Sequence, residues 1–279
     1  MNINIFLLCF NESILLPHTI NHYKTYLPNS VITIYDNEST DNSVEIAKSV
    51  GCKIISWASG NIIDDYKYID IKNNCWKNIK NGWIIVADMD EWLCVTEDQL
   101  KNELLNETTI LNVYGVEMVG ESLTVDLSDI DLQTITKYID YPTESKNLCF
   151  LREKIIDMNY GMGAHICHPE GLIIYSFIFY INKHMSNLGI PFITDKMKKR
   201  YERSKLMQSK GVAIHYTNDD NKTKSYYNEL FNKHKKLEDL IFILCISIKI
   251  NNLLNYSLFL INNWIRCHQC NSTHSPGLL

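Results

Sequence analysis

The sequence has few of the residues that build fibrous or low-complexity chains, and it has no phosphate-binding loop. Its 279 residues include only 11 glycines and 6 prolines. Charged residues make up 21% of the chain against 46% for hydrophobic ones, which is the balance of a chain that folds around a core. Neither GxGxxG nor GxxxxGKS/T occurs, so a dinucleotide-binding or P-loop protein is not favoured.

Basic charge is scarce in the first half of the chain. Residues 1–131 hold 20 acidic and 8 basic residues, a net charge of −12, whereas residues 132–279 hold 12 and 19, a net charge of +7. Nucleic-acid partners require a broad basic surface, which this distribution does not provide. We therefore expect no nucleic-acid partner.

We also expect that the apolar start of this sequence is not a secretion signal. The apolar run at residues 3–10 has no basic residue before it and Asn11-Glu12 directly after it, so it is interpreted as a strand. The nine cysteines are then expected to be reduced thiols of a cytoplasmic protein. Cys267-x-x-Cys270 has the spacing of a zinc site, but the second pair that such a site needs is missing.

The first half alternates strand and helix patterns. Apolar runs predict strands at 3–9, 31–35, 53–57 and 83–87, and helical spacing predicts helices at 14–26, 40–50 and 64–80. Ser39 or Thr40 is expected to cap the second helix, and Asn81-Gly82 to end the third. The alternation predicts an α/β fold with a mostly parallel sheet and helices on both faces.

The second half is less regular. Residues 112–180 show short strand-like runs and a glycine-rich turn at 159–171, and residues 195–205 hold six basic residues in eleven positions. The basic run is interpreted as a solvated helix face, with contact to substrate phosphates or an acidic acceptor as the alternative.

The apolar stretch at 240–265 is interrupted by Lys249 and several asparagines, so it predicts a packed helical C-terminal extension, with membrane-surface contact as the minor alternative.

Carboxylates and amides gather behind three predicted strands. Asn11 and Glu12 follow the first strand, Asp36 ends the second, and the run Asp88-Met89-Asp90-Glu91 follows the fourth. Ligands of parallel sheets bind beyond these strand ends, and close carboxylates repel one another unless protons or a cation intervene. Because magnesium and manganese prefer oxygen ligands, the run predicts a divalent cation that bridges to a diphosphate. The alternative is an acidic turn whose residues serve only as caps.

These pieces resemble a known family. Residues 5–93 resemble a family 2 glycosyltransferase of the GT-A fold, through CFNES (9–13), IYDNESTDNSVEIA (34–47), DDYKYIDIKNNCW (64–76) and ADMDEWL (87–93). The Asp-Met-Asp triplet has the form of that family's DxD signature. A wider resemblance, over about residues 3–235, is to a subgroup of microbial and large-virus enzymes; its matching residues are Lys146 with Phe150, Gly163-Ala164-His165, His184 and His215-Tyr216.

The resemblance implies a metal-dependent glycosyltransferase that uses a nucleotide-diphosphate sugar, with a UDP-sugar favoured, and that inverts the anomeric centre. It implies that Asn11 and Glu12 line the nucleotide pocket and that Asp36 contacts the base. Asp65 or Lys72 would close the nucleotide site. The acceptor would be a glycan, a lipid-linked hydroxyl or a protein.

The resemblance also implies a metal site. Asp88 would face the ribose and Asp90 would hold Mn²⁺ or Mg²⁺, with Glu91 either a further ligand or a support for the others. For each histidine, the alternative is a purely structural role. In the functional assignment, His215 binds the metal, and His165 and His184 contact the donor.

An inverting transferase also needs a general base near the acceptor hydroxyl. The candidates are Glu117, Glu170 and Asp195, with ordinary loop or cap carboxylates as the alternative for each. We expect residues 1–115 to form the nucleotide-sugar half of one GT-A domain and 116–235 its acceptor half, with 236–279 as the extension. The alternatives are a sugar-nucleotide nucleotidyltransferase, which would need a glycine-rich basic loop where CFNES stands, and a catalytically silent binding module.

Overall fold

The computed structural model describes residues 1–241 and 244. The chain divides into two units, residues 1–236 and 237–279, of which the first is described below. Most of the extension predicted for 236–279 lies outside the described residues, including Lys249, most of the 240–265 stretch and Cys267-x-x-Cys270. Within the described part of the chain, no helix is long and apolar enough to cross a membrane.

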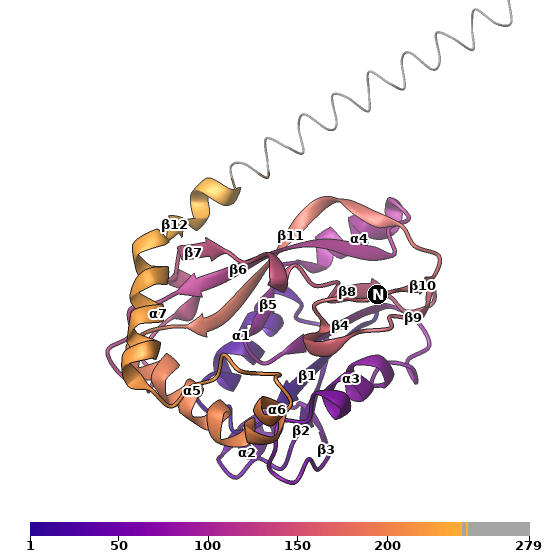
Figure 1. The fold of residues 1–279 in the computed structure, drawn as a ribbon. Coiled ribbons are helices and arrows are strands. Elements are labelled where there is room, and N and C mark those ends of the chain that lie inside the picture. Colours follow the sequence, from indigo (N-terminus) through magenta and orange to yellow (C-terminus); the bar gives the residue numbers. More distant parts are fainter. Residues whose placement is uncertain (242–243, 245–279) are drawn as a thin grey trace, which may run out of the picture. The chain divides into compact units, whose positions relative to one another are not determined.

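Strands and helices alternate through the first hundred residues, and strands dominate the middle of the chain (Figure 1). In chain order the elements are β1 (Ile3–Cys9), α1 (Leu16–Tyr26), β2 (Val31–Asp36), α2 (Ser43–Ser49), β3 (Lys53–Ser56), α3 (Asp65–Asn74), β4 (Trp83–Asp88), β5 (Glu91–Leu93), α4 (Glu97–Leu105), β6 (Ile110–Val119), η1 (Leu132–Thr134), β7 (Lys137–Asp140), η2 (Pro142–Glu144), β8 (Cys149–Leu151), β9 (Ile155–Asp157), η3 (Met162–Ala164), β10 (Glu170–Gly171), β11 (Tyr175–Asn187), α5 (Ile190–Arg203), α6 (Lys205–Ser209), α7 (Asp220–Lys233) and β12 (Lys235–Lys236).

The predicted α/β fold is confirmed, and its first half is a parallel sheet. The order β3-β2-β1-β4 is parallel throughout, and most of the paired residues of the whole sheet lie in parallel ladders. Alternate residues of a strand face opposite sides of a sheet. Ile5 and Leu7 accordingly belong to the core that includes Ile20 of α1, whereas Phe6 belongs to the opposite core with Trp76.

The second half continues the same sheet. β8 pairs antiparallel with both β4 and β6, and β6 pairs in parallel with β11. The expected short runs at 112–180 are wrong for these two strands, since β6 has 10 residues and β11 has 13. The reason is that both strands carry buried polar residues, among them Glu117 and Asn182, which break the apolar pattern. The predicted division at 115/116 falls inside β6, so the two halves share one sheet.

Two predicted helix ends are wrong, and each has a tertiary cause. α2 begins at Ser43 because the expected capping residues bond to another turn: Asn11 N donates to Ser39 Oγ at 2.9 Å and Thr40 N donates to Asn11 Oδ1 at 2.7 Å. α3 ends at Asn74, six residues before the expected end. Trp76 leaves the helix to fill the core, where it is fully buried.

Candidate active site

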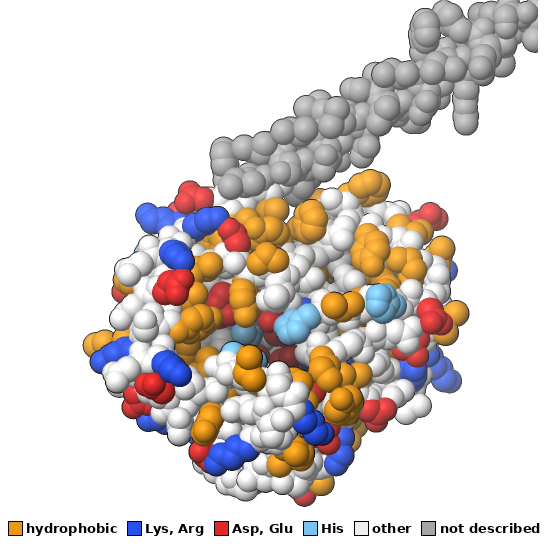
Figure 2. Space-filling view, in the orientation of Figure 1, with side chains coloured by type: hydrophobic (Ala, Val, Ile, Leu, Met, Phe, Trp, Pro, Cys, Tyr) orange, Lys and Arg blue, Asp and Glu red, His pale blue; other side chains and the backbone are white. Residues whose placement is uncertain are grey.

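A cavity of about 520 Å³ lies at the carboxyl ends of β1 and β4. Figure 2 shows a hollow on this face of the molecule with acidic and histidine side chains gathered in it. The wall is shared between the two halves of the sequence: residues 8–12 and 88–90 come from the first half, and residues of α5 with Val212, Ala213, His215 and Tyr216 come from the second. A chamber of this size accommodates a small organic ligand.

The turn after β1 is held in one shape by the turn after β2. Asn11 has a left-handed φ of 51°, and its side-chain oxygen accepts hydrogen bonds from the backbone of Thr40 and Asp41. Glu12 N donates to Ser43 Oγ at 2.9 Å, so its side chain is delivered to the cavity wall. Burial raises the pKa of Glu12 to about 7, and the positive charge of Lys196 opposes that shift.

The Asp-Met-Asp-Glu run sends its side chains in different directions. Met89 is buried in the core, and Asp88 reaches the cavity, where its Oδ2 accepts a hydrogen bond from Lys72 Nζ at 2.8 Å. Glu91 turns back on its own turn, and its Oε2 accepts from Asp88 N at 2.7 Å. Glu91 therefore supports the turn and does not line the cavity.

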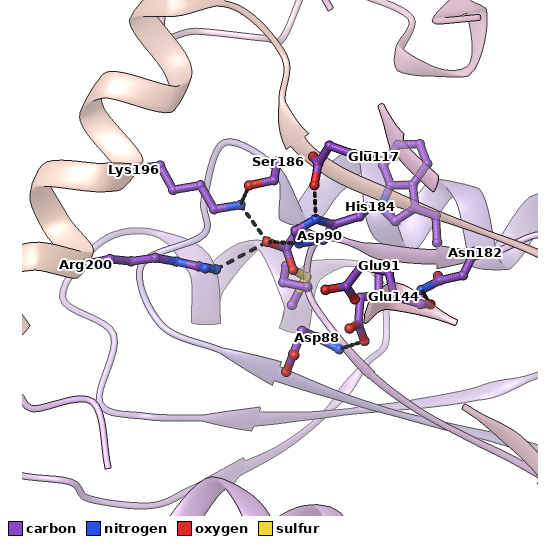
Figure 3. Close-up of polar contacts among 12 residues, drawn as sticks. Asp88, Asp90, Glu91, Glu117, Glu144, Asn182, His184, Ser186, Lys196 and Arg200 are labelled. Atoms are coloured by element: carbon purple, nitrogen blue, oxygen red, sulfur yellow. Dashed lines mark hydrogen bonds and ion pairs between the residues drawn. The ribbon is translucent and has the colours of Figure 1, made fainter. Parts of the chain in front are cut away.

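Asp90 is held by three cationic groups (Figure 3). Its Oδ2 lies 2.5 Å from Lys196 Nζ and 3.2 Å from Arg200 Nη2. His184 Nε2 lies 3.3 Å from the same oxygen. Burial raises the pKa of Asp90, but the charges of Lys196, His184 and Arg200 outweigh it and hold that pKa well below its usual range. Asp90 is consequently ionised at any physiological pH.

His184 lies between two carboxylates. It stands opposite Glu117 in the β6–β11 ladder, and its Nδ1 lies 2.6 Å from Glu117 Oε2. Burial lowers the pKa of His184, but Glu117 and Asp90 raise it well above its ordinary value. The ring is therefore an imidazolium that donates one N–H to each carboxylate.

A second cluster lies behind Asp88. Lys146 Nζ forms an ion pair with Glu91 Oε1 and lies 2.9 Å from Glu144 Oε2 and 4.0 Å from Asp88 Oδ2. Burial lowers the pKa of Lys146, but the three carboxylates, Glu91 foremost, raise it above its ordinary value. The pKa of Glu144 is lowered, because His184 and Lys146 outweigh its burial.

The structure brings most of the predicted site residues to one cavity. Those that line it are Asn11, Glu12, Asp65, Lys72, Asp88, Asp90, His165, His184, Asp195 and His215. Those that do not are Asp36, Glu91, Glu117 and Glu170. Asp36 is buried and accepts a hydrogen bond from Ser39 N at 3.2 Å, while Glu170 is exposed and accepts one from Asn159 at 3.0 Å.

Sequence reasoning missed one part of the wall and gave second place to the correct interpretation of another. Glu144 follows Pro142 in a short 3-10 turn, and its only signal was its place two residues before Lys146. The interpretation of residues 195–205 as a solvated face is wrong on one side of α5, where Lys196 is buried and Arg200 lines the cavity. It holds for Lys198 and Lys205, whose side chains are largely exposed.

The carboxylates as arranged do not fit a divalent cation. Within residues 1–241 and 244, no three His, Cys, Asp or Glu side chains are placed to hold a metal ion together. Asp90 Oδ2 is shared by three cationic groups, and Asp88 Oδ2 is bonded to Lys72. A second cation at these oxygens would be repelled by the first ones. His215 lines the same cavity with an exposed ring.

Comparison with known proteins yields distant matches. No protein-family model matches the chain. A stretch of 55 residues, 20% of this chain, is 34% identical to Protein RfbJ of Shigella flexneri, and the match spans 43% of that protein, so less than half of the relative's length is covered.

Three solved structures are also similar in part. The crystal structure of S. aureus TarS 1–349 matches with a TM-score of 0.40 and 11% identity, over 83% of this chain and 71% of that one. The same protein in complex with UDP-GlcNAc matches with a TM-score of 0.39 and 9% identity, over 83% and 72%. Glucosyl-3-phosphoglycerate synthase from Mycobacterium tuberculosis, in complex with Mn²⁺, UDP and glucosyl-3-phosphoglycerate, matches with a TM-score of 0.28 and 14% identity, over 41% and 44%. Matches this distant assign no family, and the function is therefore inferred from the cavity.

Proposed function

We propose that this chain is a glycosyltransferase of the GT-A type that moves a sugar from a nucleotide-diphosphate donor to a hydroxyl acceptor. The observation that supports this most is the convergence of Asp88, Asp90 and the Asn11-Glu12 turn on one cavity at the ends of parallel strands. Strand ends of this kind are where open α/β sheets bind nucleotides. The same residues carry the resemblance found in the sequence.

We propose a UDP-sugar as the donor. Phe10 and Tyr68 line the cavity and offer aromatic surface to a base, with the Arg203 guanidinium over one face of the Phe10 ring. Asp36 lies beneath that turn, so its role would be to fix Ser39 and the loop and not to touch the base directly. The acceptor classes remain those expected from the sequence, namely a glycan, a lipid-linked hydroxyl or a protein hydroxyl. The cytoplasmic location also remains a prediction.

We propose Asp195 as the general base of an inverting reaction. Of the three candidates Glu117, Glu170 and Asp195, only Asp195 lines the cavity, and its side chain is partly exposed. Asp195 pairs with Lys199 at 2.7 Å, which holds the carboxylate at the cavity wall, where a base must stand to take a proton from the acceptor hydroxyl. Glu144 is less suited, because it is buried against Lys146.

Mn²⁺ or Mg²⁺ remains a prediction from the sequence. If such a cation is bound, it would stabilise the negative charge of the leaving diphosphate. Its ligands would be Asp88 and Asp90, with His215 as the third. The described contacts of Asp90 do not favour this arrangement, since Lys196, Arg200 and His184 already share its Oδ2.

A donor panel tests the proposal. Purified protein is incubated with UDP-, GDP- and dTDP-sugars, with manganese and with EDTA, and donor hydrolysis is followed. We expect one donor class to be turned over, with activity lost in Asp90→Ala and Asp195→Asn. Asp98→Ala is the control, because Asp98 is exposed on α4 and pairs only with Lys101 among the described contacts.

Two results would contradict the proposal. Binding of a donor without turnover in any condition would identify a silent binding module. Pyrophosphate-dependent formation of a nucleoside triphosphate would identify a nucleotidyltransferase.

A further inference from the structure

One side of α5 presents four cationic side chains to the cavity. Lys196, Lys199, Arg200 and Arg203 follow the i, i+3, i+4, i+7 spacing that places residues on one face of a helix, and all four line the cavity wall. Figure 3 shows two of them, Lys196 and Arg200, reaching from the helix to Asp90. Lys198, which lies between them in sequence, pairs instead with Asp220 of α7.

These four cations are only partly neutralised. Lys196 and Arg200 share Asp90, and Lys199 pairs with Asp195. No carboxylate of the described residues pairs with Arg203, whose Nη2 donates to the Ile62 carbonyl at 3.4 Å. The guanidinium of Arg203 lies over the Phe10 ring, 3.2 Å from its centroid, and its Nε is buried without a hydrogen-bond partner.

The balance of charge on this side of the cavity is positive. Four cations face two carboxylates, Asp90 and Asp195, which leaves two positive charges. Glu12 adds at most part of a negative charge, since burial raises its pKa to about 7. Each of the two phosphates in a nucleotide-diphosphate sugar carries one negative charge, so donor and helix face are complementary.

Asp90 orients the cationic side chains of Lys196 and Arg200. Its single oxygen Oδ2 contacts Lys196, Arg200 and His184, and Ser186 Oγ accepts a further bond from Lys196 at 3.1 Å. With Lys196 thus held by two groups and Arg200 by Asp90 and Tyr216, both side chains are fixed before any ligand arrives. Fixed charges stabilise a bound or developing negative charge without reorganisation.

We propose that Lys196 and Arg200, with Lys199 and Arg203 beside them, bind the diphosphate of a nucleoside-diphosphate ligand directly, so that this face of α5 supplies the positive charge expected of a divalent cation. The inference rests on the proposed function and goes further, because it assigns the diphosphate to the second half of the chain. Asp90 is then a positioning residue for these cations. When the glycosidic bond breaks, Lys196 and Arg200 stabilise the charge that forms on the leaving phosphate.

Equilibrium binding of UDP to the full chain tests this, by calorimetry in EDTA and again in manganese. We expect UDP to bind in EDTA as well as it does in manganese. Arg200→Gln and Lys196→Met should each weaken that binding by about 10- to 100-fold, since each removes a charge-assisted hydrogen bond. Lys198→Met is the matched control on the exposed side of the same helix, and it should bind UDP as the wild type does.

A third variant covers the case in which Lys196→Met fails to fold. Lys199→Gln changes a half-exposed side chain, and it should weaken UDP binding in a protein with wild-type thermal stability. Binding that needs manganese, or Arg200→Gln and Lys199→Gln proteins that bind like the control, would overturn the inference while the proposed function stands. A protein that binds no nucleoside diphosphate in either condition would overturn both.

Discussion

Lys146→Met isolates the energetic cost of the buried cluster behind Asp88. The side chain of Lys146 is 4% exposed, and its partners Glu91 and Glu144 are 1% and 5% exposed. Methionine preserves the apolar stem and removes the charge. The substitution therefore leaves two buried carboxylates without their shared cation.

The expected loss of stability is large. Removing one partner of a buried ion pair costs about 3–5 kcal/mol, because the other charge stays buried and uncompensated. For a domain of this size that corresponds to a fall in Tm of about 6–20 °C. A value in the lower part of the range is expected if Lys72 moves toward the carboxylates.

The loss should depend on pH. The pKa of Lys146 is raised in the folded state, so its contribution is complete below its ordinary value of 10.5 and is lost only as the pH rises through the higher folded pKa. The pKa of Glu144 is lowered, so its contribution is present above 4.5 and is lost as the pH falls through the folded pKa. The difference between wild type and variant should then be greatest near neutral pH and smaller below pH 4.5.

Thermal unfolding at neutral and acid pH is the assay. Lys101→Met is the matched control, because it removes the same charge from a pair whose side chains are 57% and 86% exposed, and it should leave Tm unchanged at both pH values. A Lys146→Met protein that unfolds at the wild-type temperature at pH 7 would refute the reasoning. So would a difference that stays constant on acidification.

Three further predictions concern the cavity wall. Asp90→Asn removes the charge that orients the α5 cations and should lower donor turnover by about 100-fold or more; near-wild-type turnover would count against the site. Burial raises the pKa of Glu12 from 4.5 to about 7, so between these pH values the folded state binds more protons than the unfolded state. The free energy of unfolding, measured with denaturant, should therefore fall as the pH rises from 4.5 to about 7. The Glu12→Gln protein should show no such fall. The pKa of His184 is raised above 6.5 chiefly by Glu117, against burial, so its ring signals in NMR should stay those of an imidazolium at neutral pH, and its pKa should drop in Glu117→Gln. A Glu117→Gln protein whose His184 titrates as in the wild type would contradict the last of these.

Local pattern was enough to predict the parallel strands β1 to β4. β1, β2, β3 and β4 were expected within one residue at each end, because apolar runs bounded by turn residues are a short-range signal. The same pattern predicted the meeting of Asn11, Glu12, Asp88 and Asp90, since carboxyl ends of parallel strands share one edge of a sheet.

Long-range contacts decided the elements that were wrong. Ser39 and Thr40 have the chemistry of helix caps, yet they bond to Asn11, which lies 28 and 29 residues earlier in the chain. Trp76 continues a helical pattern, yet the core position beside Phe150 removes it from the helix. Propensity is a weak preference that such contacts override.

The roles of the carboxylates also depended on long-range contacts. Glu91 and Asp90 are adjacent in sequence and chemically alike, but one faces Lys146 and the other faces α5. Glu117 was a candidate base because it carries a carboxylate. In the structure it lies opposite His184 and pairs with that ring.

The order of strands, helices and acidic turns followed from residues close together in the chain, and with it the α/β fold and the edge of the sheet at which a ligand would bind. The basic run at 195–205 was visible in the sequence, but the sequence did not show which of its side chains face a ligand and which face solvent. Folding placed Lys196 and Arg200 against an aspartate more than a hundred residues away. Which carboxylates are ionised, which are neutralised and which cations remain for a ligand are set by distances of a few ångströms in a poorly solvated cavity, and such distances exist only once the chain has folded.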